Sequence, residues 1–117
     1  MQLTLDHTQR LNLHALMGAQ RGTVDQVRLF WKLQDRIQLS DPEKQAANFR
    51  LQDVNGMQQA VWDLVPANDN LPPVDYEFSD DEIARIRRVF KEWPPGFVAS
   101  DRRWLEPLLA QLERSQT

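Results

Sequence analysis

Polar and apolar side chains alternate at the start of the chain, and a helical pattern follows directly. Residues 2–5 read Gln, Leu, Thr, Leu, which predicts a short half-buried strand. Asp6 can then cap a helix that runs to about Gln20. Its inward candidates are Leu11, His14, Ala15 and Met17. Arg21-Gly22 is expected to close this helix, because glycine tolerates the left-handed conformation of a C-terminal cap.

A second helix, from Thr23 to about Leu39, has a wide apolar side. Gln26 stands three residues after Thr23 and completes a capping box. The charged residues of this helix form one stripe roughly 100° wide. They are Asp25, Arg28, Lys32, Asp35 and Arg36. The other arc of about 220° is apolar or Gln, which exceeds what one packing layer needs. Either the helix is central to the fold, or half of this arc meets a partner, with Trp31 the tryptophan expected to be exposed.

The middle of the chain predicts a short helix and then a β-hairpin. Ser40 and Glu43 form a capping box, with proline in the first turn. From residue 49 to 64 the apolar residues recur at period two around Asn55-Gly56, a pair that favours a type I′ turn. The alternating residues are Phe49, Leu51, Ala60, Trp62 and Leu64. Residues 65–74, with three prolines and no period, are expected to be a connector.

The last third repeats the order of a strand and two helices. Residues 75–78 alternate again, and Ser79 with Glu82 begins a helix that Pro94-Pro95-Gly96 ends. The inward face of this helix is Ile83, Ile86, Phe90 and Trp93. Ser100 is expected to cap the final helix, which Pro107 should kink. Its apolar residues are Trp104, Leu105, Leu108, Leu109 and Leu112.

Strand, capped helix, glycine turn and capped helix therefore occur at 2–39 and again at 75–113, offset by 73 or 74 residues. A pseudo-two-fold repeat is one explanation, and chance similarity between two ordinary helix-turn-helix segments is the other. We predict a helix-dominated α+β fold in a single domain over 1–117, a length that suits one core. Two helical hairpins, in the halves 1–45 and 75–117, flank the central β-hairpin, with short strands added.

Charge and composition narrow the range of functions. A net charge of −3 and a pI near 5.3 argue against a dedicated nucleic-acid binder, which usually carries a basic excess, although a basic face stays open. The chain has no cysteine, which removes disulfides, thiolate nucleophiles and thiolate metal sites and fits a reducing cytosol. No secretory signal and no long apolar run is visible, so we expect a cytoplasmic protein with no membrane partner.

The motifs of catalysis and metal binding are missing. His7 and His14 would lie about 10.5 Å apart along a helix, too far for two ligands of one metal. The last three acidic residues of the run at 75–82, Asp80, Asp81 and Glu82, suit the first turn of a helix, where negative charge meets the helix dipole. Glycine-rich phosphate loops and nucleophile motifs do not occur. We therefore expect no catalytic residue, no metal, no cofactor and no enzyme activity.

Arginine and tryptophan give the one compositional indication of binding. The chain has 11 Arg against 3 Lys, together with four Trp, and both Arg and Trp are enriched at binding hot spots. A basic face could extend from Arg85 to Arg103, reduced by the i, i+4 pairs Asp81–Arg85 and Arg88–Glu92. The candidate partner-binding residues are Arg28, Trp31, Arg85, Arg87, Arg88, Lys91, Arg102 and Arg103.

Three short motifs, LSDPEK at 39–44, Asn55-Gly56 and Trp62-Asp63, lie within an outline of two helical hairpins. This outline resembles small uncharacterised proteins of tailed phages and prophages, and the resemblance implies a phage or mobile-element origin without any activity. The expected function is a non-enzymatic protein–protein interaction module that binds and occludes a host protein. The alternatives are a virion or assembly component and a nucleic-acid-binding accessory protein that uses the basic face; a homodimer stays open.

Overall fold

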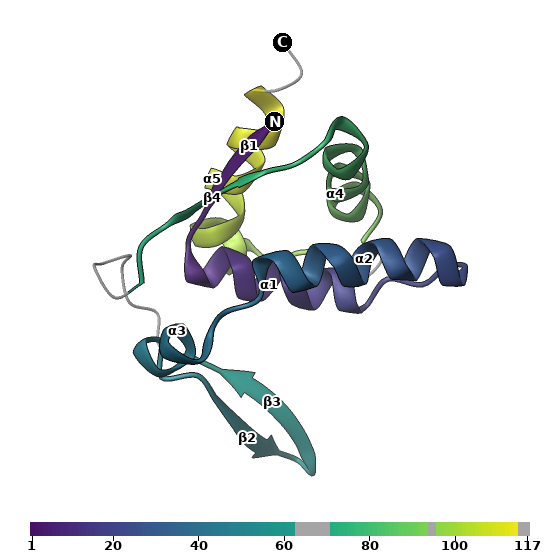
Figure 1. Ribbon diagram of the computed structural model, residues 1–117. Helices are drawn as coiled ribbons and strands as arrows, with labels where there is room; N and C mark the ends of the chain where they lie inside the picture. The colour runs from purple at the N-terminus through teal and green to yellow at the C-terminus, as the bar shows by residue number, and fades with distance from the viewer. Residues whose placement is uncertain (63–70, 94–95, 115–117) are drawn as a thin grey trace.

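The computed structural model describes residues 1–62, 71–93 and 96–114, and it shows the helix-dominated α+β fold that the sequence predicts (Figure 1). The elements in chain order are β1 (Gln2–Leu5), α1 (His7–Gly18), α2 (Val24–Ile37), α3 (Asp41–Ala46), β2 (Arg50–Val54), β3 (Met57–Val61), β4 (Val74–Glu77), α4 (Asp80–Glu92), the short 3₁₀ turn η1 (Ala99–Asp101) and α5 (Arg102–Arg114). The strands form two separate antiparallel ribbons, β1–β4 and β2–β3.

Local capping chemistry fixes where the first four helices begin. In each, the cap side chain accepts a hydrogen bond from the N3 amide, and the N3 side chain accepts one from the cap amide. The pairs are Asp6–Gln9, Thr23–Gln26, Ser40–Glu43 and Ser79–Glu82. The predicted cap at Ser100 is wrong, because Ser100 lies inside η1 and the Asp101 carboxylate accepts from the Val98 amide instead.

The C-terminal ends of α1 and α3 are closed in different ways. Gly22 does not cap α1; the helix ends at Gly18, and Ala19 follows in a right-handed conformation. The Ala19 and Gln20 amides turn back onto α1 carbonyls, so no left-handed residue is required. At the end of α3 the left-handed residue is Asn48, with φ 52°, and the Phe49 amide closes the turn on the Lys44 carbonyl at 2.8 Å.

The β1–β4 ribbon lies at the centre of the core. Leu3 opposes Tyr76 and Leu5 opposes Val74, so these four side chains share the face that packs against the helices. The main buried cluster is Leu3, Leu5, Leu13, Met17, Leu33, Ile37, Phe78, Ile83, Ile86, Leu108 and Leu112. It draws on α1, α2, α4 and α5 as well as on β1. Val89 is also buried, which the predicted inward face of α4 omits, and Ala15 of α1 is exposed.

Each outer edge of this ribbon is hydrogen-bonded by a helix from the other half of the chain. Gln111 of α5 accepts from the Thr4 amide at 2.7 Å and donates to the Thr4 carbonyl at 2.8 Å. Arg36 of α2 donates to the Glu77 carbonyl of β4. The backbone N–H and C=O groups of Thr4 point away from β4. By the alternation along an antiparallel pair, those of Glu77 point away from β1. The ribbon is therefore closed on both sides by crossed contacts between the halves.

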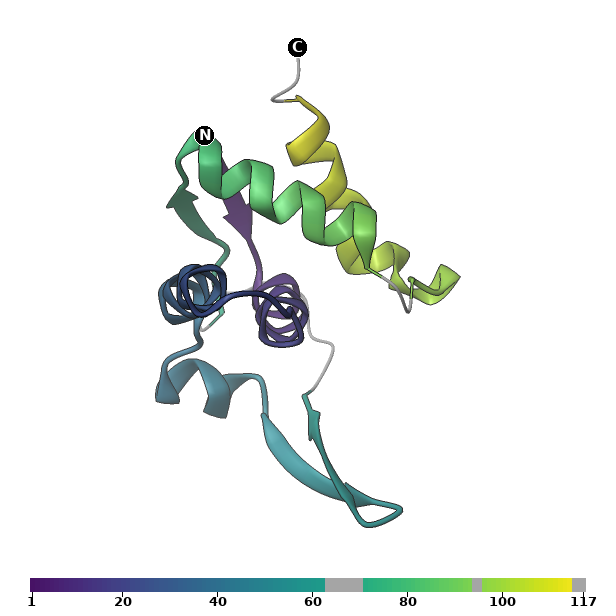
Figure 2. The same ribbon diagram turned by 90° about the vertical axis from the view of Figure 1, so that its right-hand side faces the viewer.

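The order strand, helix, helix occurs in both halves, as the repeat predicts, and we name β1–α1–α2 the first unit and β4–α4–α5 the second unit. Their strands pair antiparallel, so the two units meet at the β1–β4 ribbon. The β2–β3 hairpin lies between the units in sequence, but in space it projects from the helices, away from the β1–β4 ribbon (Figures 1 and 2). We name this hairpin, residues 50–61, the arm.

The turn of the arm has the predicted geometry. Asn55 and Gly56 have φ of 51° and 81°, and Val54 pairs directly with Met57, which makes a two-residue loop with positive φ at both positions. Residues 51–59 are all exposed. Of the connector, residues 65–70 lie outside the described part, as does Leu64; Leu71 is buried and Pro72 and Pro73 are exposed.

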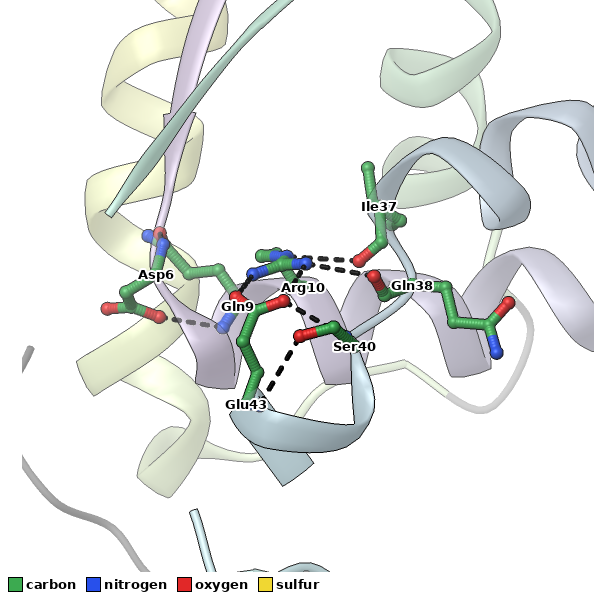
Figure 3. Close-up of polar contacts among 7 residues, drawn as sticks. All are labelled: Asp6, Gln9, Arg10, Ile37, Gln38, Ser40 and Glu43. Carbon is green, nitrogen blue, oxygen red and sulfur yellow. Dashed lines mark hydrogen bonds and ion pairs between the residues drawn. The ribbon is translucent and has the colours of Figure 1, made fainter. Parts of the chain in front are cut away.

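A buried arginine fastens α3, from which the arm starts, to the helical body (Figure 3). Arg10 of α1 is 4% exposed and donates to the carbonyls of Ile37 and Gln38 at the end of α2. It also forms a bidentate ion pair with the carboxylate of Glu43 of α3. Hydrogen bonds from Arg10 lower the pKa of the Glu43 carboxyl to about 2, although partial burial opposes this.

Candidate functional site

The structure leaves the apolar surplus of α2 in contact with solvent. This helix buries only Leu33 and Ile37, whereas Val24 and Trp31, on the other part of the arc, are 63% and 55% exposed. The exposure expected of Trp31 is thus confirmed. Arg28 is exposed beside these side chains. The protein's own core therefore covers one half of the apolar arc of α2. The other half is exposed in the described chain, where it could meet a partner.

The arm is the second apolar surface. Leu51 is 60% exposed and Met57 is 72% exposed, with Val54 also accessible. Leu51 lies on the face that carries Asp53 and Gln58, while Val54 and Met57 lie on the opposite face with Gln52 and Gln59. Each face therefore mixes apolar and polar residues. This mixture is the sequence signal that neither face of residues 51–59 is buried.

A cleft of about 710 Å³ lies between the end of the α1–α2 hairpin and α4. Its residues are Ala19, Gln20, Arg21, Gln26, Phe30, Arg85, Arg88, Val89, Glu92 and Trp93. The volume falls within the range of about 300–1,000 Å³ that is usual for ligand sites. The aromatic side chains of Phe30 and Trp93 come from different units. The cleft is thus formed only when the two units come together.

The cleft has an excess of positive charge. Arg88 pairs with Glu92 at 3.0 Å, so these two charges offset each other. Arg21 and Arg85 form no hydrogen bond or ion pair with any residue in the described ranges, and the predicted Asp81–Arg85 pair is not formed there. Two guanidinium groups consequently remain available beside an apolar floor.

The candidate basic residues do not gather on one face. Arg85 and Arg88 line the cleft, Arg87 and Lys91 line a hollow against α5, and Arg102 and Arg103 line a third hollow at the start of α5. Arg87 donates to the Leu112 carbonyl at 2.7 Å, and Arg102 pairs with Glu106. The reason is helical geometry, because Arg85 and Arg87 are about 200° apart around α4 and so flank its buried stripe from opposite sides.

The two histidines have different environments. His7 is buried, and neither of its ring nitrogens has a hydrogen-bond partner among the residues that the structure describes. His14 is half-buried, and burial together with the nearby Lys44 lowers its pKa. Within residues 1–62, 71–93 and 96–114, no three His, Cys, Asp or Glu side chains are grouped so that they could hold a metal ion.

Arg21, Phe30 and Trp93 are residues of the cleft that sequence reasoning did not select as binding candidates. From the sequence, Arg21 is expected at a helix end, Trp93 on the inward face of its helix, and Phe30 in the wide apolar arc of the second helix. Their common location depends on how the two units pack, and no spacing along the chain indicates it.

None of the helices in the described part of the chain has the length and apolar character to cross a bilayer. Comparison with protein-family models, with curated proteins and with solved structures finds no match. The resemblance to phage and prophage proteins therefore stays a prediction, and the function has to be argued from the surfaces described above.

Proposed function

We propose that this chain is a non-enzymatic protein-binding module that docks on a partner protein through the arm and occludes the surface it covers. The observation that supports the proposal is the exposure of Leu51, Val54 and Met57 on a ribbon that projects from the body. Val54 and Met57 are neighbours on one face of this ribbon and Leu51 lies on the other. Large apolar side chains that stay exposed on a projecting element are typical of interaction sites. The cysteine-free sequence supports a cytoplasmic location.

The edge of β3 supports docking by strand addition. Met57–Val61 reads MQQAV, with no charge and no proline. Edge strands that must stay unpaired usually carry lysine, proline or a bulge. A strand of the partner can therefore pair with the β3 backbone, while the adjacent apolar side chains enter pockets on the partner.

Binding of nucleic acid is the weaker proposal. The basic residues from 85 to 103 are divided among three hollows, so they do not present one row of charges to a phosphate backbone. Two-stranded ribbons backed by helices do read DNA grooves in other proteins. Here the outward face of the β1–β4 ribbon carries Gln2, Thr4, Asp75 and Glu77, and its two carboxylates would repel phosphate.

The test compares three arm variants: Leu51→Ser, Met57→Ser and Gln58→Ser. Tagged wild-type protein is used to capture partners from a bacterial lysate, and light scattering measures its mass across a concentration series. We expect one captured protein that is lost with Leu51→Ser and Met57→Ser and retained with Gln58→Ser, an exposed polar control on the same strand. A capture pattern identical in all three variants would refute docking through the arm. A dimer that only the two apolar variants abolish would make a second copy the partner, as the assembly-component alternative expects.

A further inference from the structure

The cleft between the two units offers an apolar floor to a side chain from outside. Val89 is buried at its base, and Phe30 and Trp93 are half-buried along it. Partly exposed aromatic rings in a concave site are typical anchors for an inserted aromatic or large aliphatic side chain. The volume of about 710 Å³ is enough for one such side chain with its neighbouring backbone.

Charge decides what can accompany that side chain. Among the described residues, the cleft has three guanidinium groups and one carboxylate, and the carboxylate already pairs with Arg88. Arg21 lies after α1 and Arg85 on α4, so the two available guanidinium groups come from opposite units. Guanidinium groups bind carboxylates with two parallel hydrogen bonds. A ligand with an acidic group on each side of an apolar one would satisfy both.

We propose that the cleft binds an acidic segment of the partner protein in which an aromatic residue stands between carboxylates. The aromatic ring would lie on Phe30 and Trp93, and the carboxylates would pair with Arg21 and Arg85. This inference rests on the proposed protein-binding function and names the chemistry of the partner. Because its net charge is −3, the protein as a whole repels an acidic peptide. Binding of such a peptide would therefore indicate a local cationic site.

The probe is a fluorescein-labelled peptide with two glutamates on each side of a phenylalanine, followed by fluorescence anisotropy at low salt and at physiological salt. One control peptide replaces the glutamates by glutamines, and another replaces the phenylalanine by serine. We expect each control to bind about tenfold more weakly, and we expect the acidic peptide to lose affinity as salt rises. Equal binding of all three peptides would overturn the proposal. So would tighter binding of a single-stranded oligonucleotide of equal charge, which would make the site one for nucleic acid.

Two double variants place the binding in the cleft. Arg21→Glu with Arg85→Glu should weaken the acidic peptide about tenfold or more, whereas Arg28→Glu with Arg103→Glu, an equal charge change at exposed positions outside the cleft, should change it less than about twofold. Equal losses in both double variants would refute the site. Neither Arg21 nor Arg85 has a partner in the described chain, so circular dichroism should show an intact fold. If the first double variant nevertheless unfolds, Arg21→Gln alone, on the turn, should still give about a threefold loss.

The failure of this inference can be told apart from the failure of the proposed function. If the captured protein depends on Leu51 and Met57 but not on Arg21 and Arg85, the arm binds the partner and the cleft does not. If the peptide binds the cleft while no protein is captured through the arm, the cleft inference holds as a peptide site and docking through the arm fails.

Discussion

Two antiparallel ribbons of nearly equal length in the described part of the chain are built in opposite ways. The β1–β4 ribbon joins residues 2–5 to residues 74–77, buries Leu3 and Leu5 completely, and has helices bonded to its outer edges. The arm joins strands separated by two residues, exposes Leu51 and Met57, and projects from the body. The β1–β4 ribbon can form only when the two units pack together, whereas the arm is held together by its own turn.

This contrast bears on function. A two-stranded ribbon without a packed face is marginally stable in water, so the arm contributes little to the folding free energy. Packing among the described residues therefore does not explain why the arm carries Leu51 and Met57. The β1–β4 ribbon has the reverse character, because its apolar residues are used within the core and its exposed residues are polar.

The largest expected effect comes from truncating one leucine in each ribbon. Leu5→Ala removes a fully buried side chain and should lower the free energy of unfolding by about 3 kcal/mol, from lost burial and the cavity left behind. Leu51→Ala, at an exposed position, should change it by less than about 0.5 kcal/mol. Urea unfolding followed by circular dichroism measures both. Similar losses in the two variants would show that the arm packs against the body in solution.

The next effect concerns the ion pair that fastens the base of the arm. The folded pKa of Glu43, about 2, lies below its ordinary value of 4.5, so its contribution to stability is present above pH 4.5 and is lost as the pH falls from about 4.5 to about 2. Wild type should exceed Glu43→Gln by about 2 kcal/mol at pH 7, allowing for partial exposure, and the two should converge near pH 2. Glu106→Gln, which breaks an exposed pair, is the control and should show no measurable difference from wild type at any pH. A difference between wild type and Glu43→Gln that does not change with pH would contradict the assignment.

These elements also show what sequence can and cannot predict. The caps at Asp6, Thr23, Ser40 and Ser79 and the turn at Asn55-Gly56 are local, because their hydrogen bonds or backbone angles involve residues within three positions. Alternation predicts the short strands at residues 2–5 and 75–78, but it does not predict that they pair with each other. Strand partners are chosen by packing over long separations, which no local pattern records.

The candidate site was harder to predict for the same reason. Arg10 is buried by bonds to residues 27 to 33 positions away, and nothing near it in sequence marks it as internal. Arg21 and Arg85 reach one cleft only after the two units pack together. Period two in the arm predicts its strands correctly, but it does not show which face is covered, and Leu51 is exposed on a face that it shares with Asp53 and Gln58. Exposure is a property of the assembled fold.

Edge protection gives the third test. Gln111→Ala removes both hydrogen bonds to Thr4 and should cost about 1 kcal/mol, with faster hydrogen exchange of the Thr4 amide. Gln59→Ala, on the exposed β3 strand of the arm, should leave the free energy of unfolding within about 0.3 kcal/mol of wild type. If neither change affects stability, the closed and open edges do not differ energetically, and that part of the contrast fails.

The smallest expected effect on global stability is also the most direct test of the contrast. Gly56 and Gly96 have similar positive φ, 81° and 70°, and an added Cβ would meet no atom of the described residues within 4 Å at either position. Alanine should therefore cost about 1 kcal/mol of local strain in both places. Gly96 joins α4 to the rest of the second unit, so Gly96→Ala should lower the free energy of unfolding by that amount.

Gly56→Ala should instead leave the free energy of unfolding within about 0.2 kcal/mol of wild type, because the arm opens without unfolding the body. The strain then appears as faster amide exchange at residues 51–60. The same variant should weaken partner capture, since it disorders the strand proposed to dock. If Gly56→Ala destabilises the whole protein as much as Gly96→Ala does, the arm belongs to the cooperative core, and the exposed leucine and methionine have to be explained by folding.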